Sequence, residues 1–175
     1  AEEYPEHIAL PRGCLDEVRK LFRSSGVSFR VSDKRTRGKP LAVTFKGTLR
    51  DDQQKAMDAL LPKDVGVLAA TTAFGKTVLA AAMIAARGTN VLILVHRQQL
   101  MTQWVERLQE FLDLGEVKIG RLGAGRKSLK GNIDIALLQS LVRKGSVDDR
   151  VADYGHIIID ECHHVSARNV ELAAR

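Results

Sequence analysis

The sequence predicts a three-layer α/β nucleotide-binding fold with a parallel sheet, preceded by a small α+β unit. From residue 49 onward, short apolar segments alternate with amphipathic ones, and the connections between them are short. The segments VLILV (91–95) and HIIID (156–160) are apolar on both faces. This pattern is typical of parallel strands that helices cover on both sides.

The small unit is expected over residues 1–48. A helix is predicted at 15–24, because Leu15, Val18, Leu21 and Phe22 recur at helical spacing before a Ser-Ser-Gly turn. Residues 27–31 and 41–45 predict short strands, joined by the basic turn SDKRTRGKP. This turn either contacts a nucleic-acid duplex or is a solvated turn of a packing cap.

The larger unit is expected over residues 49–175. Its predicted elements are a helix at 49–61, a strand at 65–70, a helix at 76–86, a strand at 91–95, a helix at 98–112, and strands at 117–120, 133–138 and 156–160.

Composition excludes several classes of protein. The chain has 175 residues, 45% of them apolar, which is too many for a disordered chain. Its longest apolar run, Val78 to Ala86, falls well short of the roughly 20 residues of a membrane span. The acidic start is unlike a signal peptide, and two cysteines, Cys14 and Cys162, suit a reducing compartment. We therefore expect a cytoplasmic protein with no membrane partner. Because no initiator Met is present, the chain is expected to be an excerpt of a longer one.

The net charge of +6 is concentrated in patches. Residues 19–50 hold ten Lys or Arg against one acid, Asp33, and residues 118–130 hold five basic residues and no acid. Such patches favour a polyanionic partner, although a solvated surface has the same composition.

A phosphate-binding loop is indicated at ATTAFGKT (70–77). An apolar segment precedes Gly75-Lys76-Thr77 and a helical pattern follows. Backbone N–H groups at a helix N-terminus cradle phosphates, a lysine reaches the β- and γ-phosphates, and a hydroxyl binds Mg²⁺. The general pattern has Gly where this chain has Ala70.

A second motif follows the predicted strand at 156–160. Asp160 and Glu161 stand at its carboxyl end, the edge at which open α/β sheets bind ligands. One acid there can hold Mg²⁺ and its neighbour can activate water. Taken alone, the pair could equally be a helix N-cap with a solvated neighbour.

Together these motifs resemble those of superfamily two helicases, over about residues 49–165. DECHH resembles the DEAH box, ATTAFGKT motif I, LRDDQQKA the upstream glutamine element, VLILVHRQQLMTQW motif Ia, and DIALLQSLVR a later motif that touches nucleic acid. The branch indicated is that of the type III restriction (Res) subunit and XPB-like proteins. Cys162-His163 stands where DEAD-box RNA helicases have Ala-Asp.

The resemblance implies a RecA-like, ATP- and Mg²⁺-dependent helicase domain, with a role for each matching residue. Nucleotide is contacted by Gln53 at adenine, by nearby Arg50, by the loop Thr72, Ala73, Phe74, Gly75, Lys76 and Thr77, and by His163, which couples to a partner domain. Thr77 and Asp160 hold Mg²⁺, and Lys76, Asp160 and Glu161 are catalytic. His96, Arg97, Gln103, Gln139 and Ser140 face nucleic acid, expected to be DNA.

The sequence departs from the family in two respects. Ala73 stands where glycine is usual, and a positive φ there would cost about 1 kcal/mol or more in strain. The sequence stops shortly after DECHH, so the second RecA-like domain, which supplies an arginine finger, is expected to be a missing partner. Without it the fragment is expected to hydrolyse ATP poorly.

Other interpretations stay open. The chain could be a catalytically weak nucleotide- or DNA-binding module, or a small-molecule P-loop kinase. Cys162, His163 and His164 are adjacent and cannot form a tetrahedral zinc site alone. Trp104 could stack on a base but is expected in the core, and the Gly-rich basic loop at 118–130 could touch nucleic acid.

Overall fold

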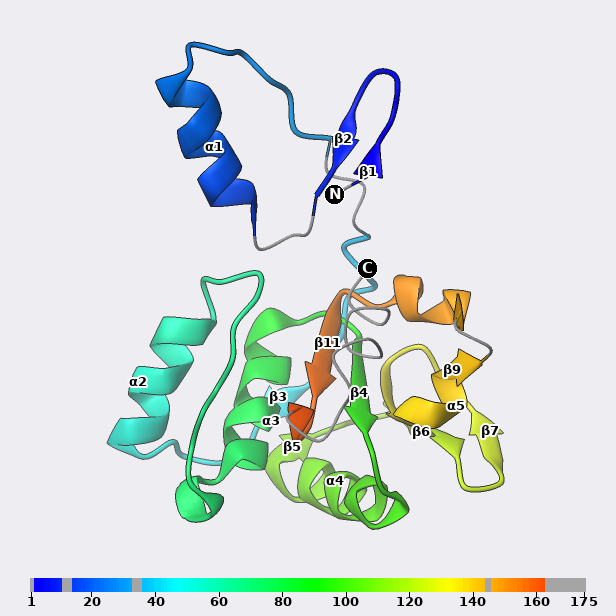
Figure 1. Cartoon of the computed structure of the whole chain (residues 1–175). Coiled ribbons are helices and arrows are strands. Elements are labelled where there is room, and N and C mark those ends of the chain that lie inside the picture. Colours follow the sequence, from blue (N-terminus) through cyan, green and yellow to red (C-terminus); the bar gives the residue numbers. More distant parts are fainter. Residues whose placement is uncertain (1, 11–13, 33–35, 144–145, 163–175) are drawn as a thin grey trace. The chain divides into compact units, whose positions relative to one another are not determined.

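The computed structural model describes residues 2–10, 14–32, 36–143 and 146–162. The chain separates into two compact units, residues 1–35 and 36–174, which are described one at a time (Figure 1). Residues 36–48, which were predicted to belong to the N-terminal unit, therefore belong to the larger one. Leu41 and Val43 of this segment are buried in its core.

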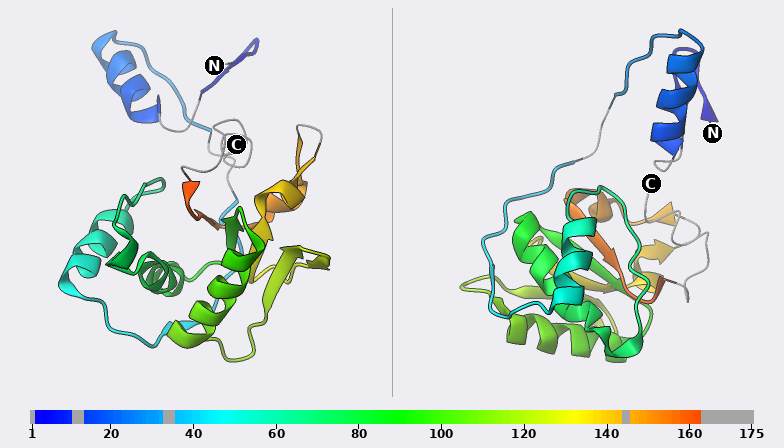
Figure 2. Two further views of the ribbon diagram at one scale, coloured as in Figure 1. Left: turned by 60° about the horizontal axis from the view of Figure 1, so that its bottom comes forward. Right: turned by 90° about the vertical axis from the view of Figure 1, so that its left-hand side faces the viewer.

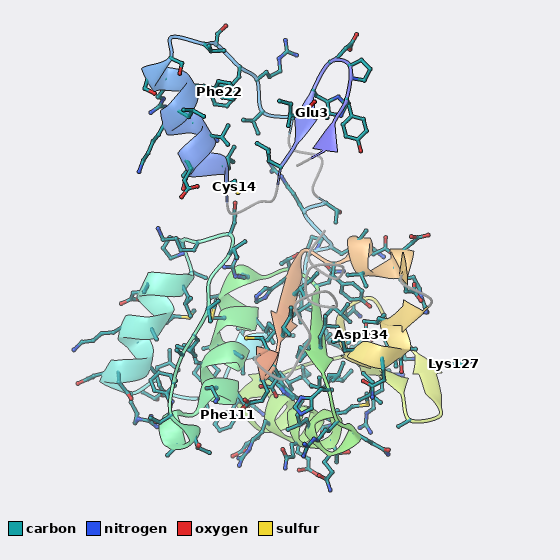
Figure 3. The ribbon with its side chains drawn as sticks, viewed as in Figure 1. Glu3, Cys14, Phe22, Phe111, Lys127 and Asp134 are labelled. Atoms are coloured by element: carbon teal, nitrogen blue, oxygen red, sulfur yellow. The ribbon has the colours of Figure 1, made fainter. Side chains whose placement is uncertain are left out.

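The smaller unit contains a hairpin and one helix. Strands β1 (Glu2–Glu3) and β2 (Ile8–Ala9) pair antiparallel. Helix α1 (Leu15–Ser24) is confirmed, and it carries Phe22 (Figure 3). The ring of Phe22 lies 5.0 Å from that of Phe29. The strand predicted at 27–31 is wrong: these residues form no regular element. Apolar alternation makes a strand only where a neighbouring strand accepts its hydrogen bonds.

A five-stranded, mainly parallel sheet forms the centre of the larger unit. Its order is β11 (His156–Ile159), β4 (Val91–Val95), β8 (Ile133–Leu137), β6 (Ile119–Gly123) and β7 (Arg126–Ser128). The first four are parallel and β7 runs antiparallel to β6. The predicted α/β fold with a parallel sheet is confirmed, and the basic 118–130 segment is largely the β6–β7 hairpin.

Helices α2 (Asp51–Leu60), α3 (Lys76–Arg87) and α4 (Gln98–Phe111) confirm their predictions within about two residues. Helix α3 is rich in alanine and ends at Gly88, whose left-handed conformation (φ 59°) suits glycine. The remaining elements are short: β3 (Thr44–Phe45) pairs with β5 (Leu112–Asp113), α5 (Leu138–Leu141) follows β8, β9 (Val142–Arg143) pairs with β10 (Ser146–Val147), and 3₁₀ turns lie at Thr72–Phe74 (η2) and Asp149–Asp153 (η3).

Apolar side chains cover both faces of the sheet. In β4, Val91, Ile93 and Val95 face a core built with α3 and α4, while Leu92 and Leu94 face a second core that includes α5 and η3. Figure 2 shows α3 and α4 on the same side of the sheet. Every residue of β4 is at most 1% exposed, which confirms the inference that this strand is covered on both sides.

The strand predicted at 65–70, before the phosphate-binding loop, does not form. Val65 and Val67 are 65% and 77% exposed, and β11, the edge strand on that side of the described sheet, pairs only with β4. The segment instead approaches α2, since a Cβ on Gly66 would lie 2.6 Å from the Leu60 side chain. A short apolar run is compatible with a strand, but the fold supplies no ladder for it here.

Candidate nucleotide-binding site

The candidate site lies at the carboxyl edge of the parallel sheet. Three neighbouring strands end there: β4 is followed by His96 and Arg97, β8 by Gln139 and Ser140, and β11 by Asp160 and Glu161. Because these strands are parallel, residues distant in sequence reach one edge, as in other open α/β sheets that bind ligands.

The phosphate-binding loop turns sharply before α3. Thr72–Phe74 forms the 3₁₀ turn η2, and Gly75 follows in the left-handed conformation with φ 79° and ψ 44°. Helix α3 then begins at Lys76, and the first amides of a helix have no partners within it, so they can receive an anion. Ala73 has no positive φ. The strain considered for Ala73 therefore does not arise, because the left-handed step falls on Gly75.

Gln53 and Arg50 support this loop from α2. Gln53 is 2% exposed; its Oε1 accepts from the Arg50 backbone N–H (3.0 Å), and its Nε2 donates to the Phe74 carbonyl (2.7 Å). Arg50 Nη2 donates to the same carbonyl at 2.8 Å. A Cβ on Gly75 would lie 2.6 Å from Gln53 Nε2, so this position needs glycine for space as well as conformation. The contact of Gln53 and Arg50 with adenine stays a prediction.

An ion pair joins the two motifs. Lys76 Nζ lies 3.4 Å from Glu161 Oε1, and the two side chains are 35% and 30% exposed. Glu161 has φ 51°, a conformation that non-glycine residues adopt at a cost and that clusters at functional sites. The structure thus brings together the predicted phosphate-binding lysine and the predicted water-activating carboxylate.

Asp160 is held from two sides. Its backbone N–H donates to the Leu94 carbonyl of β4 (2.9 Å), and its Oδ2 accepts from Trp104 Nε1 of α4 (2.7 Å). Trp104 is 4% exposed, which confirms that it lies in the core. Sequence reasoning did not find its contact with Asp160. The sequence could have suggested this contact only through a general rule, namely that a buried indole N–H needs an acceptor.

A cavity of about 220 Å³ adjoins Glu161. It is lined by His96, Arg97, Gln99, Leu100, Gln103 and Glu161. Three of the residues predicted to face nucleic acid, His96, Arg97 and Gln103, therefore share one cavity with the predicted catalytic glutamate. Gln99 and Leu100 were not identified from the sequence.

The remaining predicted residues are more dispersed. Gln139 is exposed and Ser140 half-buried in α5, and neither lines the cavity. Thr72 and Ala73 are exposed in η2, while Thr77 is half-buried in the first turn of α3. His163 lies outside the described residues.

Metal and membrane features are limited in the described part of the chain. There, no three or more His, Cys, Asp or Glu side chains are grouped so as to hold a metal ion by themselves. None of the helices described is both long enough and apolar enough to cross a bilayer.

Comparison with known proteins agrees with the geometry. Residues 46–174 match the family described as type III restriction enzyme, res subunit. The chain is 36% identical to a Rad25 protein of Halobacterium salinarum, provisionally named a DNA 3′-5′ helicase, over 79% of this chain and 22% of the relative. It is 29% identical to the DNA 3′-5′ translocase XPB2 of Sulfurisphaera tokodaii, over 91% of this chain and 35% of the relative.

A third relative, from Acanthamoeba polyphaga mimivirus, is provisionally named an ATP-dependent RNA helicase. It is 30% identical over 73% of this chain and 25% of its own length. The chain thus spans between about a fifth and about a third of the length of these three curated relatives. With the family match over 46–174, a mainly parallel sheet and both motifs at one edge, this chain belongs to the type III restriction enzyme, res subunit family of superfamily two helicases.

Proposed function

We propose that the chain is the first, ATP-binding motor domain of a DNA helicase or translocase. The observation that carries this proposal is the Lys76–Glu161 ion pair, because it joins the predicted phosphate-binding lysine to the predicted water-activating glutamate. The names of the XPB-like and Rad25-like relatives support a DNA track.

ATP would bind at the N-terminus of α3. The phosphates would be received by the first amides of this helix, with Lys76 moving from Glu161 to the β- and γ-phosphates. Gln53 and Arg50 both donate to the Phe74 carbonyl. These two bonds would hold the loop in place before nucleotide binds.

Mg²⁺ fits the oxygen donors that are present. In nucleotide sites this ion is usually held by one or two carboxylates together with substrate phosphates, and not by an all-protein cage. The Thr77 hydroxyl and the Asp160 carboxylate are donors of this kind. When bound, the ion would neutralise charge on the β- and γ-phosphates.

Hydrolysis would be an in-line attack by water on the γ-phosphorus. The bond between that phosphorus and the β–γ bridging oxygen breaks, giving ADP and phosphate, and the Glu161 carboxylate accepts the proton of the water. While Lys76 pairs with Glu161, this carboxylate is engaged. Transfer of Lys76 to phosphate would break this ion pair when substrate binds.

Nucleic acid would lie along the cavity lined by His96, Arg97 and Gln103. Basic and amide side chains at strand ends donate to phosphate oxygens, which positions a strand without reading its sequence. We further propose a second RecA-like domain as the partner that completes the site, in keeping with the greater length of the relatives.

The test is ATP turnover by the longer protein that carries these residues, with duplex DNA, single-stranded DNA and RNA added separately. We expect stimulation by DNA, and a loss of about 100-fold or more in Glu161→Gln, which removes the proton acceptor. Glu106→Gln, on the surface of α4, is the matched control and should leave turnover unchanged. Stimulation by RNA alone would overturn the DNA assignment. Turnover that is unaffected in Glu161→Gln would overturn the catalytic one.

A further inference from the structure

We propose that Trp104 is a positioning residue that sets the orientation of the Asp160 carboxylate for its role toward Mg²⁺. This inference rests on the proposed function, because it deepens the account of the same site. Its evidence is the hydrogen bond of 2.7 Å from Trp104 Nε1 to Asp160 Oδ2, which joins residues 56 positions apart.

The indole is well placed to fix this carboxylate. Trp104 is 4% exposed and packs in the core cluster that includes Met101, Val105 and Leu108 of its own helix. A side chain held by packing on a rigid helix cannot follow a carboxylate that rotates. The Asp160 backbone is fixed as well, through its bond to Leu94. Rotation about the side-chain bonds of Asp160 is therefore the freedom that the indole N–H removes.

The bond also gives the two oxygens of the Asp160 carboxylate different roles. Trp104 occupies one acceptor position on Oδ2, and its N–H can only donate. Oδ1, which this bond does not use, would then be the oxygen that holds Mg²⁺ or a water bound to it. Outer partners that orient a metal-binding side chain typically change metal affinity or activity by 10- to 100-fold when removed.

Helix α4 consequently carries two kinds of contact. Leu100 and Gln103 line the cavity beside Glu161, and Trp104 holds Asp160. Leu100 and Trp104 are four positions apart and so lie on one face of the helix. The helix that forms the wall of the proposed nucleic-acid cavity is thus bonded directly to the proposed metal carboxylate.

The experiment separates positioning from packing. Trp104→Phe removes the N–H donor and keeps an aromatic ring, whereas the control Val105→Ala removes buried apolar volume on the same helix without touching Asp160. Calorimetry measures the affinity of each variant for a non-hydrolysable ATP analogue, first with Mg²⁺ and then with EDTA. The ratio of the two affinities is the Mg²⁺-dependent gain.

We expect Trp104→Phe to reduce this gain by about tenfold and to leave the affinity in EDTA within twofold of wild type. Val105→Ala should keep the full gain even if it lowers stability more. An unchanged gain in Trp104→Phe would overturn the inference. If the wild-type protein bound the analogue neither with Mg²⁺ nor with EDTA, that result would instead overturn the proposed function.

A second measurement needs no variant. The chain contains one tryptophan, so its fluorescence reports on Trp104 alone. We expect the emission to shift when the analogue is added with Mg²⁺ and to stay constant when it is added with EDTA at saturation. Emission that is identical in the two saturated states would contradict a link between this indole and the metal carboxylate.

Discussion

Asn90 is a buried polar side chain whose removal should strongly destabilise the larger unit. It is 1% exposed and precedes β4. Its Oδ1 accepts from the backbone N–H groups of Lys39 (2.9 Å) and Gly155 (3.0 Å), and its Nδ2 donates to the carbonyls of Gly131 (3.1 Å) and Asp153 (3.0 Å). One amide thus connects the segment at Lys39 with the two segments that lead into β8 and β11.

The change Asn90→Ala leaves two N–H groups and two carbonyls without these partners. An unsatisfied buried donor costs about 1–3 kcal/mol, and carbonyls tolerate the loss better. Because these bonds are partly buried, we take about 1 kcal/mol for each N–H and about 0.5–1 kcal/mol for each carbonyl. The free energy of unfolding should therefore fall by about 3–4 kcal/mol, a large part of the usual 5–15 kcal/mol, roughly, for a domain.

Urea denaturation followed by circular dichroism measures this loss. Asn132→Ala is the matched control, since Asn132 contacts β4 through its backbone carbonyl, which accepts from the Val91 N–H at 2.8 Å. That variant should lose less than about 1 kcal/mol. An equally small loss in Asn90→Ala would refute the reasoning that this amide joins the three segments.

Three further predictions follow from individual contacts. Burial, with a smaller contribution from the charge of Arg87, lowers the pKa of His156 from 6.5 to about 4. Between those values the unfolded chain binds the proton and the folded chain does not, so the unfolding free energy should fall as pH drops from about 6.5 to 4, by at most about 3 kcal/mol; denaturation of His156→Gln should show a weaker slope in that window. Gly75→Ala should lower stability by about 1–2 kcal/mol, through left-handed strain and contact with Gln53 Nε2, whereas Gly26→Ala, open to solvent, should lose the strain cost alone. Tyr154→Phe should lower the free energy of unfolding by about 1–2 kcal/mol in the same assay, because its hydroxyl donates to the buried Asp134 carboxylate at 2.7 Å. If Tyr154→Phe lowered stability as much in the Asp134→Asn background as in wild type, that result would argue against the bond.

Much of the fold follows from local patterns in the sequence. The helices at 51–60, 76–87 and 98–111 were predicted because each buries one apolar face, and β4 and β11 because their apolar runs are short and bounded. The strand predicted at 65–70 does not form, because a strand also needs a neighbour and its sequence does not specify one. The β7 strand, which extends the basic loop into a hairpin, was missed because it carries no apolar alternation.

The residues of the candidate site could likewise be predicted from the sequence only in part. Lys76 and Glu161 could be named from the sequence because each belongs to a local motif, and their contact follows from the edge at which parallel strands end. The bonds from Gln53 to Phe74 and from Trp104 to Asp160 join residues 21 and 56 positions apart. No local pattern encodes them, since they depend on how α2 packs beside α3 and how α4 packs on the sheet. The positive φ of Glu161 likewise becomes visible only in the folded chain.

The central claim is that residues 72–77 form a nucleotide site together with Asp160 and Glu161. Calorimetric titration of this chain with a non-hydrolysable ATP analogue and Mg²⁺ tests it most directly, comparing wild type with Lys76→Ala and with Lys55→Ala, an exposed lysine on α2. The account predicts binding by wild type and by Lys55→Ala, and an affinity lower by at least about tenfold in Lys76→Ala, which removes the charge paired with Glu161. Equal affinity in all three proteins, or binding by none of them, would contradict it.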